Sequence, residues 1–213
     1  FSKAALSILP TIDFRPDIIH CHDWQTGLIP VYLSSTFQEN EFYRGIKTIM
    51  TIHNLKFQGV WDIKTVKDIV GLPDYYFTPD KLEFHKDGDL LKGGLVYANA
   101  ITTVSKTYAE EIKMPYYGEG LDGLMRARAN DLRGIVNGID YDVFNPATDK
   151  VIYQNYDART FRKEKVKNKL ALQADLGLAV DPKVMLIGIV SRLTDQKGFD
   201  LIAYVMDELC QDA

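Results

Sequence analysis

VMLIGIVSRLTDQKGFDLI, residues 184–202, is the stretch of this sequence that says most about the fold. It begins with a short, unbroken apolar run, Val184–Val190, which is bounded by polar residues. Such a run predicts a β-strand buried on both faces, as in parallel sheets covered by helices. A short polar turn then leads through Lys197 and Gly198 into an amphipathic helix.

Two cations, Arg192 and Lys197, lie between the end of this strand and the start of the helix. Free N–H groups and the macrodipole attract phosphate to a helix N-terminus. Arginine adds a planar fork of donors and lysine a point charge, so the pattern predicts a phosphate site. A solvated turn carrying two unrelated cations is the alternative, and spacing alone leaves both readings open.

Apolar strand candidates alternate with helical candidates along the whole chain. The strand candidates are Asp17–Cys21, Ile46–Ile52, Ala100–Val104, Leu132–Val136 and Val184–Val190. The helical candidates are Trp24–Phe37, Asp62–Val70, Asp89–Asn99, Ser105–Ile112, Thr160–Leu176 and Phe199–Leu209. This alternation predicts an α/β fold of the Rossmann-like kind, a parallel sheet with helices on both faces.

The composition narrows the function classes. The 213 residues are 46% hydrophobic and 25% charged, with a net charge of −4. No basic tract stands out, so nucleic acid is not expected as a partner. No apolar run approaches the roughly 20 residues of a membrane-spanning helix, so no membrane association is expected either. The two cysteines, Cys21 and Cys210, are expected to be buried as small apolar side chains.

Polar residues follow each strand candidate. His22 and Asp23 follow the first, His53 and Asn54 the second, and Asn137 and Gly138 the fourth; Ser191 and Arg192 follow the fifth. In open parallel sheets, ligands bind beyond the carboxyl ends of the strands. We therefore expect one ligand site built from these loops.

Several of these residues allow two interpretations. His20-x-His22 has the spacing of a metal pair, but zinc or iron needs a third ligand, and His20 is more readily a hydrogen-bonded core residue. Asp23 fits a helix N-cap as well as a substrate contact. Trp24 fits either a core position or a platform for a sugar ring. The donor-rich loop His53–Gly59 suits a neutral sugar, or is simply a hydrogen-bonded loop.

Two glycine-rich stretches do not support nucleotide binding. Gly118–Gly123 fits G-x-G-x-x-G, but no strand candidate precedes it and it contains two acidic residues, so no NAD or FAD site is expected. Lys92-Gly93-Gly94-Leu95 lies inside a helical candidate.

Together these motifs resemble bacterial glycogen synthases and plant starch synthases. The matching segments are PDIIHCHDWQTGLIPVYL (16–33), TIHNLKFQG (51–59), ITTVSKTYAEEI (101–112), YGEGLDGLMRARANDLRGIVNGIDYDVFNPATD (117–149) and GIVSRLTDQKGFDLI (188–202). The resemblance implies the GT-B fold, in which two Rossmann-like domains face each other across a cleft. It also implies a metal-free glycosyltransferase that moves glucose, with retention, from ADP-glucose to the non-reducing end of an α-1,4-glucan.

The resemblance assigns roles at matched positions. Arg192 and Lys197 would bind the donor diphosphate, and His53 the donor glucose. Asp23, Trp24 and Asn54 would hold the acceptor glucan, while Asn137 and Gly138 would line the cleft near the sugar. We count His53, Arg192, Lys197 and Asp23 as candidate catalytic residues and Trp24, Asn54, Asn137 and Gly138 as candidate substrate-binding residues; no metal ligand and no cofactor is expected.

The resemblance also predicts an incomplete enzyme. Residues 1–177 would form an N-terminal, acceptor-side domain without its first strands, and residues 178–213 the start of the nucleotide-sugar domain. The family's N-terminal K-x-G-G-L loop and its C-terminal acidic motif are not found, so we expect residues 1–213 to be inactive alone. A GT-B transferase using UDP-glucose and a non-catalytic glucan-binding module remain alternatives. The expected location is the cytoplasm of a bacterium or a plant plastid stroma.

Overall fold

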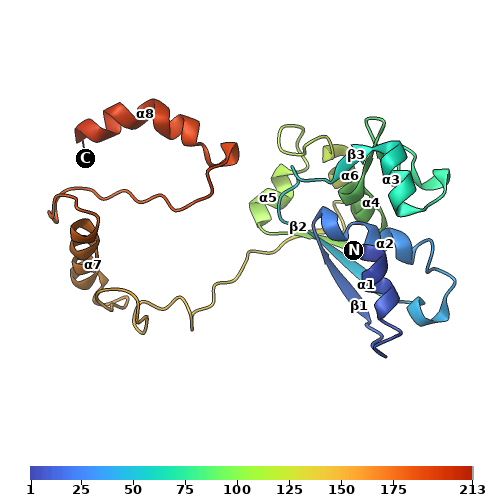
Figure 1. Ribbon diagram of the computed structural model, residues 1–213, viewed down its shortest axis with the longest axis horizontal. Helices are drawn as coiled ribbons and strands as arrows, with labels where there is room; N and C mark the ends of the chain where they lie inside the picture. Colours follow the sequence, from blue (N-terminus) through green and yellow to red (C-terminus); the bar gives the residue numbers. More distant parts are fainter. Residues whose placement is uncertain (213) are drawn as a thin grey trace. The chain divides into compact units, whose positions relative to one another are not determined.

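The computed structural model describes residues 1–212 and divides into two compact units, Phe1–Gly138 and Ile139–Ala213 (Figure 1). The sequence predicted a domain boundary after residue 177, whereas this division falls after Gly138. The boundary after Gly138 reflects how compactly the chain is folded, whereas the boundary after residue 177 follows from the domain architecture of the family. The first does not test the second, so the domain assignment stays a prediction.

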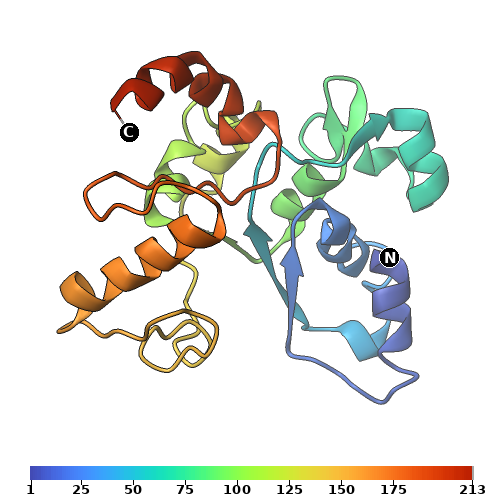
Figure 2. The ribbon, with the colours of Figure 1, turned by 60° about the vertical axis from the view of Figure 1, so that its left-hand side comes forward.

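Unit 1 is built on a four-stranded parallel sheet with the order β1-β2-β6-β7. Its strands are β1 (Ile18–His22), β2 (Lys47–Ile52), β6 (Ala100–Thr103) and β7 (Leu132–Gly134). Each neighbouring pair is parallel, and the arrowheads of β1 and β2 point the same way in Figure 2. The predicted parallel α/β sheet is therefore confirmed for the first four strand candidates. All their carboxyl ends lie at one edge of the sheet.

The helices of unit 1 are α1 (Ser2–Ile8), α2 (Leu28–Leu33), α3 (Ile63–Val70), α4 (Leu90–Tyr97), α5 (Lys106–Glu111) and α6 (Asp122–Ala127). The helices predicted over Asp62–Val70, Asp89–Asn99 and Ser105–Ile112 correspond to α3, α4 and α5, whereas α6 was not predicted. Asp89 and Ser105 cap α4 and α5 by accepting backbone N–H bonds from the first turn. Short 3-10 turns are η1 (Trp24–Thr26), η2 (Glu41–Tyr43) and η3 (Asp74–Tyr76).

The helix predicted over Trp24–Phe37 is shorter than expected. Residues 24–26 form the 3-10 turn η1, and α2 ends at Leu33. The hydroxyl of Ser35 donates to the carbonyl of Val31, at 2.7 Å. Hydroxyl side chains compete in this way for helix carbonyls, which explains the early end.

A second, antiparallel sheet was not predicted. It has the order β3-β5-β4, with β3 at Val60–Asp62, β5 at Asp87–Asp89 and β4 at Glu83–Phe84. Strands of two or three residues show no readable alternation, so the sequence gives no periodic signal for them. This sheet lies between β2 and β6 in the chain and carries α3 directly after β3.

The core of unit 1 lies between the parallel sheet and its helices. It includes Met50, Ile52, Leu91, Leu95 and Ile101, all fully buried. Cys21 is also buried, as expected, and burial raises the pKa of its thiol to about 12. Cys210 is exposed, so the prediction of a buried side chain was wrong for that residue.

Unit 2 contains α7 (Phe161–Asp175), the 3-10 turn η4 (Asp195–Lys197) and α8 (Phe199–Asp212). The strand predicted over Val184–Val190 is not formed: this segment is irregular, and most of its side chains are exposed. A parallel strand is stable only when neighbouring strands accept its hydrogen bonds and helices cover its faces. Among the described residues of unit 2 there is no strand to pair with it.

Candidate functional site

The candidate site lies at the carboxyl edge of the parallel sheet, where β1 and β2 end. His22 is the last residue of β1 and pairs in register with Thr51 of β2. Asp23 and His53 come directly after these two strands. The structure thus brings together two candidate residues that are far apart in the sequence.

Asp23 connects the two strand ends. Its Oδ1 accepts a hydrogen bond from the backbone N–H of His53, at 2.8 Å. Asp23 precedes the 3-10 turn η1, but its carboxylate makes no capping bond there. The carboxylate therefore positions the His53 loop and does not cap a helix. Its backbone has φ 55° and ψ −174°, a region that residues other than glycine rarely adopt.

Three imidazoles lie in a row at this edge. His20 stands 4.2 Å from His22 between ring centroids, and His22 stands 5.2 Å from His53. Nδ1 of His22 and Nε2 of His53 form a hydrogen bond of 2.9 Å. His20 Nε2 is bonded to the Thr51 hydroxyl at 2.6 Å, so the predicted hydrogen bond is present. His20 is exposed, however, so the prediction of a core position was wrong.

The pKa of His22 is lowered from its ordinary value. Partial burial is the main cause, and the neighbouring His20 and His53 add to it, while Asp23 opposes it. Each cause except Asp23 disfavours the imidazolium. His22 is therefore a neutral imidazole at neutral pH, with one donor and one acceptor nitrogen.

The loop after β2 is held at several points. The Leu55 N–H donates to the Tyr108 hydroxyl at 3.0 Å, and the Asn54 side chain accepts from the Lys56 N–H at 3.1 Å. The buried side chain of Gln58 donates to the carbonyls of Leu55 and Glu119. The loop is thus anchored to α5 and to the segment before α6, which keeps the backbone around His53 in place.

Trp24 lies between the core and an open groove. Its ring covers Gly59, where an added Cβ would come within 2.6 Å of a ring carbon. On another side it meets Trp61 of β3 edge to face, with ring centroids 5.1 Å apart. A groove of about 510 Å³ begins here, lined by Trp24, Lys56, Phe57, Gln58, Gly59, Val60, Trp61 and Glu119. Trp24 therefore packs against other residues and also lines the groove, and its role as a platform for a sugar ring stays a prediction.

The aromatic walls of this groove are accessible. Phe57 is 51% exposed and Trp61 is 45% exposed, although both are large apolar side chains. Lys56 and Glu119 place charged groups beside them. Apolar ring faces with a few polar groups are typical of sites that bind small polar ligands such as sugars.

Four predicted site residues come from other segments of the chain, Asn137, Gly138, Arg192 and Lys197. Asn137 and Gly138 are exposed in irregular chain beyond β7, which ends earlier than predicted, at Gly134. Arg192 and Lys197 belong to unit 2. Both are exposed, and Lys197 ends η4 directly before Gly198 and α8. Over residues 1–212 neither side chain forms an ion pair with a carboxylate.

The two glycine-rich stretches have the secondary structure that the sequence predicted. Gly118–Gly123 follows turns and not a strand. The stretch around Lys92 lies within α4, and the ammonium group of Lys92 donates to the carbonyls of Pro79 and Glu83. This lysine therefore holds a loop of the second sheet together and does not face the candidate site.

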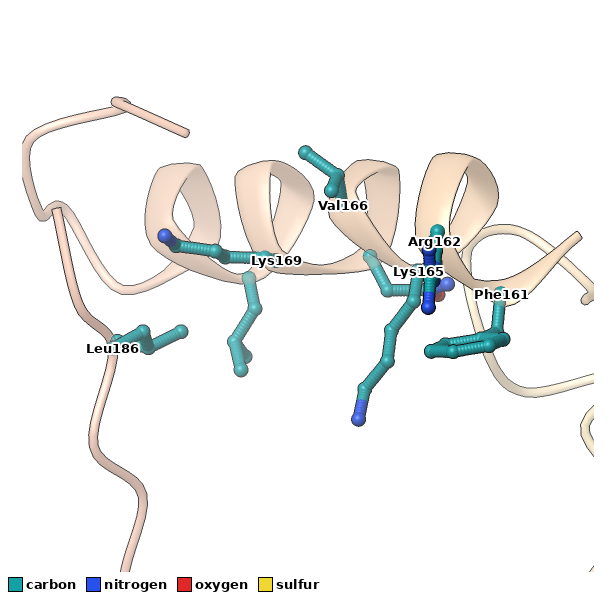
Figure 3. A pocket seen from close by; sticks show the side chains of 8 residues that line it. Phe161, Arg162, Lys165, Val166, Lys169 and Leu186 are labelled. Carbon is teal, nitrogen blue, oxygen red and sulfur yellow. The ribbon is translucent and has the colours of Figure 1, made fainter. Parts of the chain in front are cut away.

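Other features of the described chain do not form a competing site. Within residues 1–212 no group of three or more His, Cys, Asp or Glu side chains is arranged to hold a metal ion. No helix in the same range is long and apolar enough to cross a membrane. A cavity of about 480 Å³ runs along α7, where Leu186 reaches toward the helix from the segment beside it (Figure 3). Its other lining residues, Phe161, Arg162, Lys165, Val166, Asn168, Lys169 and Leu172, all belong to α7, and no carboxylate is among them.

Sequence reasoning missed two contributors to the site. His22 was considered as half of a metal pair and as one of the polar residues after the first strand, but no specific role was assigned to it, although alternation in a strand places His20 and His22 on one face, where their rings meet. Trp61 lies on the unpredicted β3, so its meeting with Trp24 could not be foreseen.

Comparison with known proteins gives one consistent result. Residues 1–127 match the family model described as the starch synthase catalytic domain. The chain is 71% identical over 212 residues to a glycogen synthase from Lachnospira eligens and 49% identical over 209 residues to one from Thermotoga maritima. These two alignments include 100% and 98% of this chain, but only 44% and 43% of the length of the two relatives.

A solved structure agrees. The catalytic domain of starch synthase IV from Arabidopsis thaliana, bound to ADP and acarbose, matches with a TM-score of 0.86 and 32% identity. The match covers 99% of this chain and 43% of that one. The chain thus spans less than half the length of the relatives to which it is similar.

Proposed function

Because this chain belongs to the starch synthase catalytic domain family, we propose that it is the acceptor-side part of a glucosyltransferase that elongates an α-1,4-glucan. The proposed donor is ADP-glucose, and glucose is transferred to the non-reducing end with retention at the anomeric carbon. The bacterial glycogen synthases among its relatives support the reaction class. The ADP in the related plant structure supports the choice of donor.

The observation that carries the proposal is the hydrogen bond between Asp23 and His53 at the carboxyl edge of the sheet. It joins the ends of two parallel strands, which is where open α/β sheets bind ligands. Beside it, the groove of Trp24, Phe57 and Trp61 provides aromatic faces for sugar rings. An imidazole, a carboxylate and aromatic walls suit an uncharged polysaccharide better than an anionic ligand.

The proposed chemistry needs stabilisation of a departing diphosphate. Arg192 and Lys197 would supply it, since preorganised positive groups aimed at developing negative charge are often the largest catalytic contribution. His53 would bind a hydroxyl of the donor glucose, and Asp23, Trp24 and Asn54 would hold the acceptor. Asn137 and Gly138 would border the sugar site. No metal or cofactor is part of this proposal.

Residues 1–213 alone are not expected to catalyse transfer. The segment that leads to Arg192 does not form a strand, and its apolar side chains are exposed. The two cations are therefore not held by a rigid element, and preorganisation is what makes such groups effective. Given its bacterial relatives, we propose the bacterial cytoplasm as the site of action.

The test is a transfer assay on the full-length protein that carries this sequence, with radiolabelled ADP-glucose and maltooligosaccharide acceptors. We expect label in longer oligosaccharides, loss of incorporation in His53→Ala, and weaker incorporation from UDP-glucose. A preference for UDP-glucose would identify the related transferase instead. Maltooligosaccharide binding without any transfer from either donor would identify a glucan-binding module and overturn the proposal.

A further inference from the structure

His22 has no role in the function proposed above, yet its side chain contacts that of His53 directly. His22 ends β1, and its Nδ1 is 2.9 Å from Nε2 of His53, which follows β2. The contact therefore joins neighbouring parallel strands through two imidazole rings. It uses Nε2 of His53, so Nδ1 is the ring nitrogen that the contact leaves for a ligand.

A hydrogen bond between two imidazole rings links the proton positions of the two rings. One ring must donate an N–H and the other must accept it with a lone pair. Once His22 adopts one tautomer, the proton position of His53 is fixed as well. The groups facing His22 are His20, His53 and Asp23, and the first two disfavour its protonation.

His22 is itself held in place on several sides. The Thr26 hydroxyl donates to its backbone carbonyl at 2.9 Å, and the His20 ring lies against its own ring. His20 is bonded to the Thr51 hydroxyl, which is bonded in turn to that of Thr102 at 2.6 Å. This row crosses β1, β2 and β6, so the orientation of His22 depends on the sheet and not on a mobile loop.

We propose that His22 is a positioning residue that fixes the ring orientation and tautomer of His53, so that His53 presents Nδ1 to a hydroxyl of the donor sugar. Asp23 holds the backbone of His53 and His22 holds its ring. The two anchors complement each other, because the carboxylate alone leaves the imidazole free to rotate about its side-chain bonds. This inference rests on the proposed function for the identity of the substrate but not for the imidazole contact.

The chain offers a matched pair of variants. In asparagine the amide nitrogen and oxygen are attached to Cγ, as Nδ1 is in histidine. In glutamine the amide atoms are attached to Cδ and therefore lie one bond further from Cβ. His22→Asn therefore retains a hydrogen-bonding group where Nδ1 lies, and His22→Gln does not. His85→Asn is the control, because His85 lies between β4 and β5 and asparagine tolerates its positive φ of 51°.

The first measurement is ¹⁵N NMR of the histidine rings of this chain, which separates protonated from unprotonated ring nitrogens. The chain has four histidines, and His53→Ala and His85→Asn identify the signals. We expect His53 to show one dominant tautomer in the wild type and in His22→Asn, and averaged nitrogen signals in His22→Gln. Unchanged His53 signals in His22→Gln would overturn the proposed coupling.

The second measurement is steady-state transfer by the full-length protein. We expect His22→Gln to lower kcat about tenfold with little change in the acceptor KM, and His22→Asn to recover most of it. Equal kcat in wild type and His22→Gln, or equal losses in both variants, would overturn the positioning role. If the wild type itself transfers no glucose, the proposed function fails together with this role, while the NMR result still decides the contact between the two imidazoles.

Discussion

Oδ1 of Asp23 lies 2.8 Å from the backbone nitrogen of His53 and accepts its hydrogen bond. The carboxylate reaches this position from a backbone with φ 55° and ψ −174°, which costs about 1–3 kcal/mol for a residue with a Cβ. The backbone is held there by its own hydrogen bonds: the Asp23 N–H donates to Thr51, and the Asp23 carbonyl accepts from Thr26. Strained conformations of this kind cluster at functional sites.

The first prediction concerns this strain. Asp23→Ala and Asp23→Gly both remove the carboxylate, but only glycine adopts the Asp23 conformation without a steric penalty. We expect Asp23→Gly to be more stable than Asp23→Ala by about 1–2 kcal/mol in urea unfolding. This reverses the usual order, in which glycine is the less stable of the two. Equal stability, or a more stable alanine variant, would show that the conformation of residue 23 is not strained.

The second prediction concerns Asp89, which is fully buried at the start of α4. Its Oδ1 accepts from the Lys92 N–H at 2.8 Å, while its Oδ2 has no hydrogen-bond partner. Burial raises the pKa of Asp89 from 3.8 to about 7, against hydrogen bonds and the Lys92 charge, which lower it. Between these pH values the folded state binds more protons than the unfolded state, so stability falls as pH rises.

Asp89→Asn keeps an acceptor for the cap and does not titrate. We expect its unfolding free energy, relative to wild type, to rise between about pH 4 and pH 7 by a few kcal/mol and then level off. Urea unfolding of both proteins at matched pH values measures this difference, and the contributions of other groups such as His22 cancel. A difference that does not vary with pH would contradict the raised pKa.

The sequence predicted the parallel sheet and the position of the site for a physical reason. Strands β1, β2 and β6 are short segments rich in apolar and β-branched residues that alternate with helices, which is typical of a parallel sheet, and the polar residues after them could only gather at one edge. It did not predict β3–β5, because strands this short have no periodicity. The strand over Val184–Val190 failed for the opposite reason: its pattern is strong, but a strand needs neighbours that the described part of unit 2 lacks. The contacts of Asp23 with His53 and of His22 with His53 depend on register and backbone angles, which composition does not encode.

The third prediction concerns the groove beside Trp24. Trp61 meets Trp24 edge to face and remains 45% exposed. If its free surface stacks on the acceptor, Trp61→Ala should raise the acceptor KM about tenfold, equivalent to about 1.4 kcal/mol, with the donor KM unchanged. Trp61→Phe keeps an aromatic face and should lose less. Kinetics of the full-length protein with maltooligosaccharides provide the measurement.

Tyr75→Ala is the matched control for the groove, because Tyr75 is an exposed aromatic residue of η3 that does not line it. Its acceptor KM should equal that of the wild type. If Trp61→Ala shows the same acceptor KM as Tyr75→Ala, the groove does not bind the acceptor.

The fourth prediction concerns the two cations before α8. The left-handed turn at Gly198, with φ 66°, lets the chain pass from η4 directly into the helix, so Lys197 lies beside the free N–H groups of its first turn. Arg192 precedes this turn on exposed chain. If both groups neutralise the departing diphosphate, Arg192→Ala and Lys197→Ala should each lower turnover of the full-length protein on the order of 10²-fold or more.

Calorimetry provides a second measurement of the role of these cations. Both variants should bind ADP more weakly but retain maltooligosaccharide binding. Lys183 is another exposed cation of unit 2, so Lys183→Ala is the control and should change neither ADP binding nor turnover. Near-normal turnover in the Arg192 or Lys197 variant would mean that these cations belong to a solvated turn, and the source of diphosphate stabilisation would have to lie elsewhere in the protein.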